Sequence, residues 1–204
     1  MAARYVVFEG IDGAGKTTLI RGVRGALEAR GIPVVVTKEP TDGPIGRRIR
    51  ELATRGRGTV SPEEELALFH EDRRIHVAEV VRPALVAGKT VLQDRSFYST
   101  VAYQGDRGLD RAAILARSLE IAELPGLLLV VDLPAELALE RLRQGRGVTD
   151  DFESLSSLRR VRAVFQSFTE SGGPPPSHLL DGCLPENMLL SSALALIDGT
   201  STPE

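Results

Sequence analysis

Residues 10–17 of the chain, Gly-Ile-Asp-Gly-Ala-Gly-Lys-Thr, fit the spacing G-x-x-x-x-G-K-[ST]. In this pattern the glycines let backbone N–H groups point at a polyphosphate, the lysine neutralises charge, and the hydroxyl can coordinate Mg²⁺. The residues predicted to hold the phosphates are Gly10, Ile11, Asp12, Gly13, Ala14, Gly15, Lys16, Thr17 and Thr18. We therefore expect the chain to bind a nucleoside triphosphate together with Mg²⁺.

The segments on either side of this loop favour a functional motif over a chance match among the 20 glycines of the chain. Residues 5–8 form a short apolar run typical of a buried strand. Leu19, Val23 and Leu27 then recur at helical spacing until Gly31. Strand, loop and helix thus follow one another in the order that a phosphate-binding loop requires.

Composition predicts a single soluble α/β domain. The 204 residues suit one domain, placed at residues 1–198 with a flexible tail at 199–204. The net charge of -3 argues against a nucleic-acid-binding surface. No apolar run approaches the ~18 residues needed to cross a membrane. The lone cysteine, Cys183, cannot form an internal disulfide, so we expect a cytoplasmic protein.

The expected elements alternate between strands and helices. Apolar runs predict buried parallel strands at residues 5–8, 33–36, 90–92, 127–131 and 178–180. Residues 61–64, Ser-Pro-Glu-Glu, combine an N-cap, a first-turn proline and a capping-box glutamate, and predict a helix from 61 to about 87. Further helices are expected at 134–144 and 151–168, separated by a short mobile lid at about 143–153.

Polar side chains follow the expected strands, where open α/β sheets bind ligands. They lie at residues 38–43, 94–96 and 181–182. Arginines gather at 47–50, 73–74 and 141–146, and phosphate is the natural partner of such groups. Arginines 159, 160 and 162 are expected on a solvated face. The three histidines, His70, His76 and His178, indicate solvated or structural roles rather than catalysis.

Four motifs together resemble the thymidylate kinase family. They are FEGIDGAGKTT at residues 8–18, Glu39-Pro40, Leu68-Phe69 with Arg73, and DRSFYSTVAYQG at residues 94–105. The resemblance implies a P-loop kinase fold with a five-stranded parallel sheet flanked by helices on both faces. It also implies a homodimer.

The resemblance assigns roles to individual residues. Lys16, Asp12 and Arg95 would act in catalysis, with Thr17 and Asp94 at the metal. Phe69 would stack on thymine, Arg73 would donate to a base carbonyl, and Tyr103 would crowd the sugar 2′ position. The full set of implied dTMP contacts is Asp12, Glu39, Pro40, Arg50, Phe69, Arg73, Arg95, Ser99, Thr100, Tyr103 and Gln104.

Lid arginines complete the implied site. Some family members carry an arginine inside the phosphate loop where this chain has Gly13, and similar sequences with glycine there use arginines of the lid. Arg143 and Arg146 are therefore the expected catalytic arginines. Related lids often read Asp-Arg-x-Glu, whereas residues 150–153 here read Asp-Asp-Phe-Glu, so that Asp151 replaces an arginine.

The implied reaction is Mg²⁺-dependent transfer of the γ-phosphoryl group of ATP to dTMP. The acceptor phosphate has a second pKa near ~6 and needs no general base. Two alternatives stay open at this point. A deoxynucleoside kinase would use Glu39 as a base towards a hydroxyl, and a catalytically silent nucleotide-binding relative would have a lid that Asp151 keeps from closing.

Overall fold

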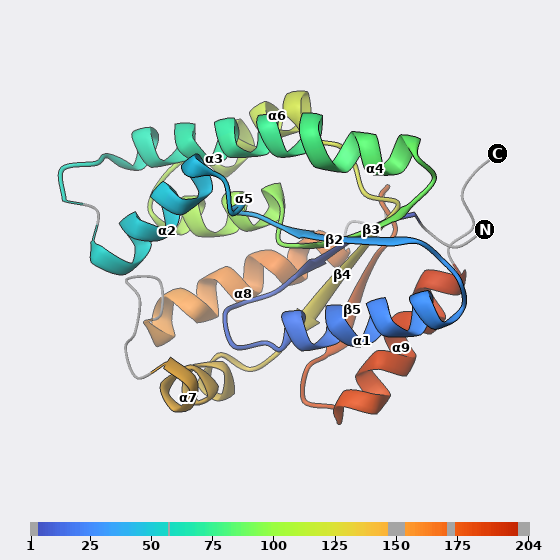
Figure 1. Cartoon of the computed structure of the whole chain (residues 1–204). Helices are drawn as coiled ribbons and strands as arrows, with labels where there is room; N and C mark the ends of the chain where they lie inside the picture. Colours follow the sequence, from blue (N-terminus) through green and yellow to red (C-terminus); the bar gives the residue numbers. More distant parts are fainter. Residues whose placement is uncertain (1–3, 57, 147–153, 171–173, 200–204) are drawn as a thin grey trace.

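The computed structural model describes residues 4–56, 58–146, 154–170 and 174–199, and contains one sheet of parallel strands in the order β2-β3-β1-β4-β5 (Figure 1). The strands are β1 (Tyr5–Glu9), β2 (Val34–Lys38), β3 (Thr90–Asp94), β4 (Leu127–Asp132) and β5 (Ser177–Asp181). The predicted α/β class and five-stranded parallel sheet are confirmed. Each strand after β1 follows a helical connection, as parallel pairing requires.

Helices cover both faces of the sheet. Helices α1 and α9 pack together on one face, while α4, α5 and α8 pack on the other, with α3 and α6 outside α5 (Figure 1). The helices are α1 (Lys16–Ala29), α2 (Pro44–Arg55), α3 (Pro62–His76), α4 (Arg82–Val86), α5 (Phe97–Asp106), α6 (Arg111–Ile121), α7 (Ala135–Arg146), α8 (Leu155–Glu170) and α9 (Glu186–Gly199). Among the described residues, no helix has the length and apolar character required to cross a membrane.

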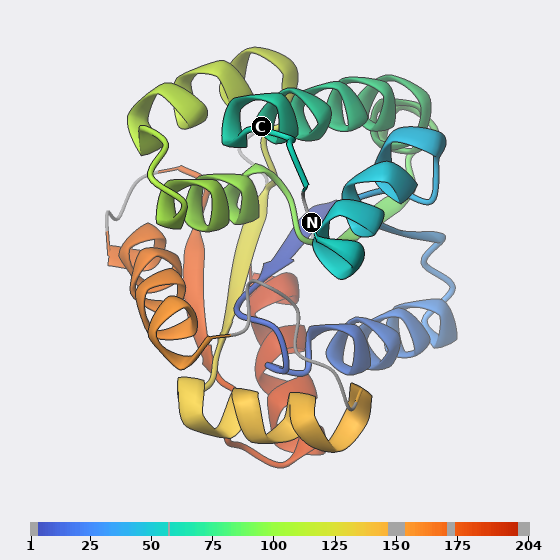
Figure 2. The same ribbon diagram turned by 90° about the vertical axis from the view of Figure 1, so that its left-hand side faces the viewer.

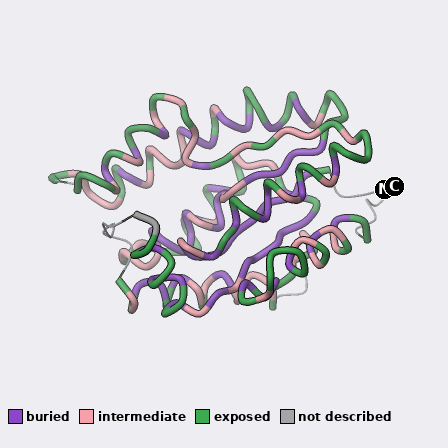
Figure 3. The backbone as a smooth tube through the Cα atoms, turned by 60° about the horizontal axis from the view of Figure 1, so that its bottom comes forward, coloured by how far each residue is buried: buried purple, intermediate pink, exposed green. Residues whose placement is uncertain are grey.

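Buried residues concentrate in the middle of the sheet and on the inward sides of the helices (Figure 3). All of β1 is buried, and β4 is buried up to its last residue. The expectation of five buried strands is wrong for the two edges. Val36 of β2 is 42% exposed and Leu179 of β5 is 45% exposed, because each edge strand has a neighbour on one side only.

The long helix predicted from residue 61 begins as expected. The Ser61 hydroxyl accepts from the Glu64 backbone N–H at 3.1 Å, and the Glu64 carboxylate accepts from the Ser61 N–H at 2.8 Å. The helix does not continue as a regular α-helix. A π-helical turn, η1 (Val77–Val81), joins α3 to α4, and such turns often occur at functional sites.

The second half of the chain corrects two expectations and leaves two open. Arg159 and Arg160 are exposed, as expected, although they are ion-paired with Glu136 and Asp106, whereas Arg162 is only partly exposed and is ion-paired with Asp132. Gly199 belongs to α9, and residues 200–204 of the expected tail lie outside the described residues. The lid prediction covers the end of α7 and then residues 147–153, which also lie outside them.

The topology concentrates ligand-binding positions beside β1. The chain moves from β1 outward to β2 and back to β3, and then crosses to β4 and β5 on the other side. Such a switch point opens a crevice outside the carboxyl ends of the strands. In Figure 2, which looks towards this end of the sheet, the loop after β1 lies between α2 above and α7 below.

Candidate active site

The loop between β1 and α1 is glycine-rich because its backbone has no room for side chains. Gly10 has φ +136°, and a Cβ there would lie 2.4 Å from the Val131 carbonyl oxygen. Gly13 has φ +81°, and its Cβ would lie 2.6 Å from the Ala138 carbonyl oxygen. The loop therefore sits tightly against the end of β4 and the first turns of α7. Helix α1 begins at its last residues, and its N-terminus favours an anion.

Lys16 is buried within this loop. Its Nζ donates to the carbonyl oxygens of Gly10 and Ile11, both at 3.0 Å. Burial and, to a smaller extent, the nearby positive charge of Arg95 lower the pKa of Lys16 to about 8. The ammonium is held along the loop, in the position where it can meet the phosphates of a bound nucleotide.

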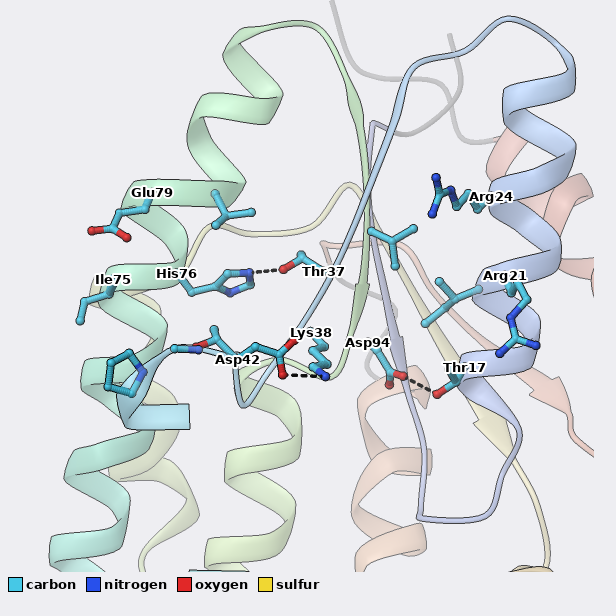
Figure 4. Close-up of a pocket in the computed structure, with 16 residues that line it drawn as sticks. Thr17, Arg21, Arg24, Thr37, Lys38, Asp42, Ile75, His76, Glu79 and Asp94 are labelled. Carbon is cyan, nitrogen blue, oxygen red and sulfur yellow. Dashed lines mark hydrogen bonds and ion pairs between the residues drawn. The ribbon is translucent and has the colours of Figure 1, made fainter. Parts of the chain in front are cut away.

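Thr17 and Asp94 form the candidate metal site at the ends of α1 and β3. The Thr17 hydroxyl donates to Asp94 Oδ2 at 2.8 Å, as Figure 4 shows. Asp94 Oδ1 is buried and has no hydrogen-bond partner among the described residues. The described part of the chain holds no cluster of three or more metal-binding side chains. A hydroxyl and an unsatisfied carboxylate oxygen fit Mg²⁺, which takes few protein ligands and completes its shell with water and phosphates.

A cavity of about 560 Å³, the phosphate cavity, surrounds these groups. It is lined by the predicted phosphate-binding residues Asp12, Gly13, Gly15, Lys16, Thr17 and Thr18, together with Asp94 and Arg95. A second cavity of about 860 Å³ extends from the same loop between α1 and the connection that follows β5. The two cavities share the phosphate loop, so a nucleotide can lie across both.

The arginine that contacts this loop belongs to the group at 141–146 but is not one of the two lid arginines expected in catalysis. Arg141 of α7 lines both cavities and donates to the carbonyl oxygens of Gly13, at 3.5 Å, and Gly182, at 3.4 Å. Arg143 is exposed and does not line the phosphate cavity. The side chain of Arg146 lies outside the described residues. Arg141 lies about one helical turn after Ala138, which packs on the loop, and this packing has no signal in the sequence.

A connected polar cluster adjoins the phosphate loop and consists of Asp12, Arg95, Ser99 and Tyr103. Arg95 donates to Asp12 Oδ1 and to the Ser99 hydroxyl, both at 2.9 Å, and the Tyr103 hydroxyl donates to Asp12 Oδ2 at 2.9 Å. Burial alone would lower the pKa of Arg95, but Asp12 holds it well above its ordinary value. Arg95 has φ +65°, uncommon for a residue with a side chain, as is often found at functional sites.

A buried carboxylate supports this cluster from below. Glu9 is fully buried, and its Oε1 accepts from the backbone N–H groups of Ser96 (2.7 Å) and Ser99 (3.2 Å) and from the Ser96 hydroxyl (3.0 Å). Its Oε2 accepts from the Ser99 hydroxyl at 2.6 Å. Burial raises the pKa of Glu9, although these donors and Arg95 oppose the shift. Glu9 thus fixes the first turn of α5 to the end of β1.

A third cavity, the nucleoside cavity, has a volume of about 180 Å³ and lies between α2, α3 and α5. The structure brings every predicted dTMP contact to its lining: Asp12, Glu39, Pro40, Arg50, Phe69, Arg73, Arg95, Ser99, Thr100, Tyr103 and Gln104. Arg50 reaches back to the carbonyl oxygens of Pro40 (2.8 Å) and Thr41 (2.7 Å). The binding roles of these residues stay predictions.

Arg73 is fixed at the back of the nucleoside cavity. Its Nε and Nη2 meet Glu39 Oε2 at 2.9 and 2.8 Å, and its Nη2 donates to the Thr100 hydroxyl at 2.9 Å. Two buried donors of this cavity, Arg73 Nη1 and Gln104 Nε2, have no partner among the described residues. Burial alone would raise the pKa of Glu39, but Arg73 and His76 lower it below its ordinary value. Glu39 is therefore an ion-pair partner, which disfavours it as a general base.

His76 is neither exposed nor solvated. It is 3% exposed, and its Nδ1 lies 3.0 Å from Glu39 Oε1 while its Nε2 lies 2.6 Å from the Thr37 hydroxyl. Its role within α3 is structural, in keeping with one of the two roles that the sequence indicated. The solvated role that the sequence left open is wrong for His76, because this side chain is buried against the end of β2 and the residue that follows it.

Comparison with known proteins gives one consistent family. The family model described as Thymidylate kinase matches residues 8–173. A thymidylate kinase of Xanthomonas campestris pv. campestris is 41% identical over 192 residues, which cover 94% of this chain and 82% of that protein. Thymidylate kinases of Desulfotalea psychrophila (43% identity; 81% and 82% covered) and Akkermansia muciniphila (46%; 80% and 78%) match similarly. With a phosphate loop, an adjoining nucleoside cavity and relatives that match over most of its length, the chain belongs to the thymidylate kinase family.

Proposed function

We propose that this chain transfers the γ-phosphoryl group of ATP to the phosphate of dTMP, giving dTDP and ADP. One observation carries the assignment beyond family membership. The phosphate cavity and the nucleoside cavity adjoin, because Asp12, Glu39, Pro40, Arg50 and Arg95 line both. A nucleotide in each cavity would bring its phosphates together at Arg95, between the loop and the first turn of α5.

ATP would occupy the donor side. Its β- and γ-phosphates would lie against the amides of the loop and Lys16, with the rest of the nucleotide in the cavity lined by Arg141. Thr17 and Asp94 would hold Mg²⁺, which supplies charge neutralisation at the phosphates. Arg141 adds a guanidinium at the same loop. Whether Arg143 or Arg146 also reaches the reacting phosphoryl group stays a prediction.

The acceptor side favours a pyrimidine with carbonyl oxygens. Arg73 Nη1 and Gln104 Nε2 are buried donors in need of acceptors. Thymine offers two carbonyl oxygens, whereas the exocyclic amino group of cytosine would bring a donor towards a donor. Phe69 lines the same cavity and can stack on the ring. On the phosphate side, Asp12 would accept from the sugar 3′-hydroxyl and Arg95 would hold the acceptor phosphate.

The chemistry requires positioning and positive charge rather than proton transfer. The acceptor phosphate is largely dianionic at pH 7, so its oxygen attacks the γ-phosphorus without a base. Lys16 and Arg95 neutralise the charge on the phosphoryl group and its neighbours. The ion-paired state of Glu39 disfavours a deoxynucleoside kinase. Asp151, which would mark a silent relative, lies outside the described residues.

A coupled ADP-release assay with Mg²⁺-ATP tests the assignment. The purified protein is offered dTMP, dUMP, dCMP, dGMP and thymidine separately. Rapid turnover of dTMP, weaker turnover of dUMP and none of thymidine support the kinase. Turnover of thymidine but not dTMP would instead require Glu39 as a base, and silence with all five would favour a catalytically silent relative.

Two variants test the residue roles. Lys16→Ala and Arg95→Ala should each lower kcat by orders of magnitude while circular dichroism shows a folded protein, because each removes charge from the phosphates. Near-normal turnover by either variant would contradict its assigned role. A homodimer, tested by light scattering, and a cytoplasmic location remain predictions, the first from the family resemblance and the second from the single cysteine.

A further inference from the structure

Helix α3 carries a buried polar face beside the nucleoside cavity. Asp72, Arg73 and His76 are 4%, 1% and 3% exposed, and Arg73 and His76 lie one helical turn apart. Buried polar side chains are retained in a stable fold only when they are hydrogen-bonded. Each of these three side chains is hydrogen-bonded to the segment that ends β2 and leads to α2.

That segment offers a partner at every second residue. The Thr37 hydroxyl meets His76, Glu39 meets Arg73 and His76, and the Thr41 hydroxyl donates to Asp72 at 2.6 Å. Strand β2 ends at Lys38 and the chain bends at Glu39 and Pro40, yet Thr37, Glu39 and Thr41 all reach the same face of α3. One helix face thus fixes one side of the segment by a row of polar contacts.

His76 supplies the contact that Arg73 cannot. Both contacts between Arg73 and Glu39 are made at Oε2, and within the described chain Oε1 is hydrogen-bonded to His76 Nδ1 alone. The ionised carboxylate only accepts, so Nδ1 carries the proton and the Thr37 hydroxyl can donate to Nε2. His76 therefore fixes the rotation of the carboxyl group on which Arg73 rests.

His76 does this without lining the nucleoside cavity. Together with Thr37 it lines a separate groove of about 610 Å³ over the edge of β2, opposite Arg21 and Arg24 (Figure 4). Glu39 and Arg73 line the nucleoside cavity instead. His76 therefore forms part of the wall between the groove and the cavity, and any effect it has on substrate passes through Glu39 and Arg73.

We propose that His76 is a positioning residue for the pyrimidine base, holding Glu39 so that Arg73 Nη1 faces the base carbonyl. The inference rests on the proposed function, in which Arg73 reads that carbonyl. Without the Nδ1 donor, Oε1 is a buried acceptor with no partner, and the carboxyl group rotates towards other donors. Arg73 then moves with it, and the base loses an aligned donor while the phosphate loop, on the far side of Asp12, is unaffected.

Two variants of His76 separate positioning from bulk. In His76→Asn the side-chain amide can take the position of Nδ1 and keep the donor to Glu39, whereas in His76→Gln it reaches the position of Nε2 and keeps only Thr37. For each variant we would measure the KM for dTMP, the inhibition constant of dCMP, the KM for ATP and kcat. Loss of one aligned hydrogen bond to the base predicts about a tenfold higher KM for dTMP in His76→Gln. The ratio of the dCMP inhibition constant to this KM should fall by a similar factor.

In His76→Asn, the ratio of the dCMP inhibition constant to the KM for dTMP should stay within about threefold of the wild-type value. The KM for ATP and kcat should change little in both variants. An unchanged ratio in His76→Gln, an equal loss in the two variants, or a parallel rise of both KM values would overturn the inference. Arg73→Gln distinguishes this from a failure of the proposed function. If Arg73→Gln keeps the preference for dTMP over dCMP, the base assignment itself is wrong. If it loses the preference while His76→Gln keeps it, only the role of His76 is wrong.

Discussion

Two serines of one turn bind the same buried carboxylate, and the structure predicts that they are not equivalent. Ser99 donates its hydroxyl to Glu9 Oε2 at 2.6 Å, and within the described chain this oxygen has no other hydrogen bond. Ser96 donates its hydroxyl to Oε1, which also accepts from two backbone N–H groups. Replacing each serine by alanine removes the same hydroxyl from the same carboxylate. Only Ser99→Ala leaves an oxygen without a donor.

The magnitudes follow from that difference. An unsatisfied, buried and charged acceptor costs about 2–3 kcal/mol, so Ser99→Ala should lower the free energy of unfolding by about 2.5 kcal/mol. Ser96→Ala removes one of several bonds to the same oxygen, at about 0.5–1 kcal/mol. In a chain of this length 1 kcal/mol shifts the Tm by about 2–4 °C, which gives about 5–10 °C for Ser99→Ala and about 1–4 °C for Ser96→Ala.

Thermal and urea unfolding of both variants would measure these losses. Burial already raises the pKa of Glu9, and Ser99→Ala raises it further, so the deficit of this variant should be smaller at pH 5 than at pH 8. Ser99 also accepts from Arg95 at 2.9 Å, so kcat/KM for dTMP should fall in Ser99→Ala alone. Equal losses of Tm, or a larger loss in Ser96→Ala, would refute the reasoning that one carboxylate oxygen depends on one hydroxyl.

Other expected outcomes concern the loop, a histidine and the metal. Gly10→Ala, whose Cβ would lie 2.4 Å from the Val131 oxygen at φ +136°, should lose about 3 kcal/mol or more in urea unfolding. In the control Gly25→Ala the added Cβ would have no atom within 4 Å, so its free energy of unfolding should rise by up to about 1 kcal/mol. Comparable urea midpoints for the Gly10 and Gly25 variants would contradict the crowding at Gly10. Burial lowers the pKa of His70 to about 4, so stability should rise as the pH increases from about 4 to 6.5. His70→Gln should flatten that rise in Tm, and an unchanged profile would mean that His70 titrates normally in the folded protein. Thr17→Ser should keep the Mg²⁺ dependence of turnover whereas Thr17→Val should need much more Mg²⁺, and identical Mg²⁺ titrations would remove the hydroxyl from the site.

Periodicity and motif order were sufficient for the sheet because they depend on local sequence. The runs at 5–8 and 127–131 are apolar at every position, as strands covered on both faces must be, and they became β1 and β4. Edge position was not predictable in the same way. The run at 33–36 is as apolar as a central strand, but whether a strand has one neighbour or two is decided by the crossover connections. For the same reason the π-helical turn after His76 has no recognisable signal in its residues.

The same distinction between local sequence and tertiary packing applies to the residues of the site. Residues within continuous motifs, such as the phosphate loop and the turn at 94–105, were assigned to the site before any geometry was known, and the structure gathers them around two adjoining cavities. The contact of Arg141 with the loop and the burial of His76 were not predicted, because both depend on what faces these residues. Arg141 meets the loop only because α7 packs on Gly13, and His76 is buried only because β2 ends opposite α3.

The ion pair between Asp12 and Arg95 means that an incoming dTMP exchanges partners rather than filling a vacant charge. Its phosphate would take Arg95 from Asp12, and its 3′-hydroxyl would then donate to the carboxylate that the phosphate has displaced. Inorganic phosphate would perform only the first half of this exchange, because it carries no sugar hydroxyl to replace the cation that Asp12 loses. We therefore expect free inorganic phosphate to compete poorly for the acceptor site, although it carries the same charged group as the substrate.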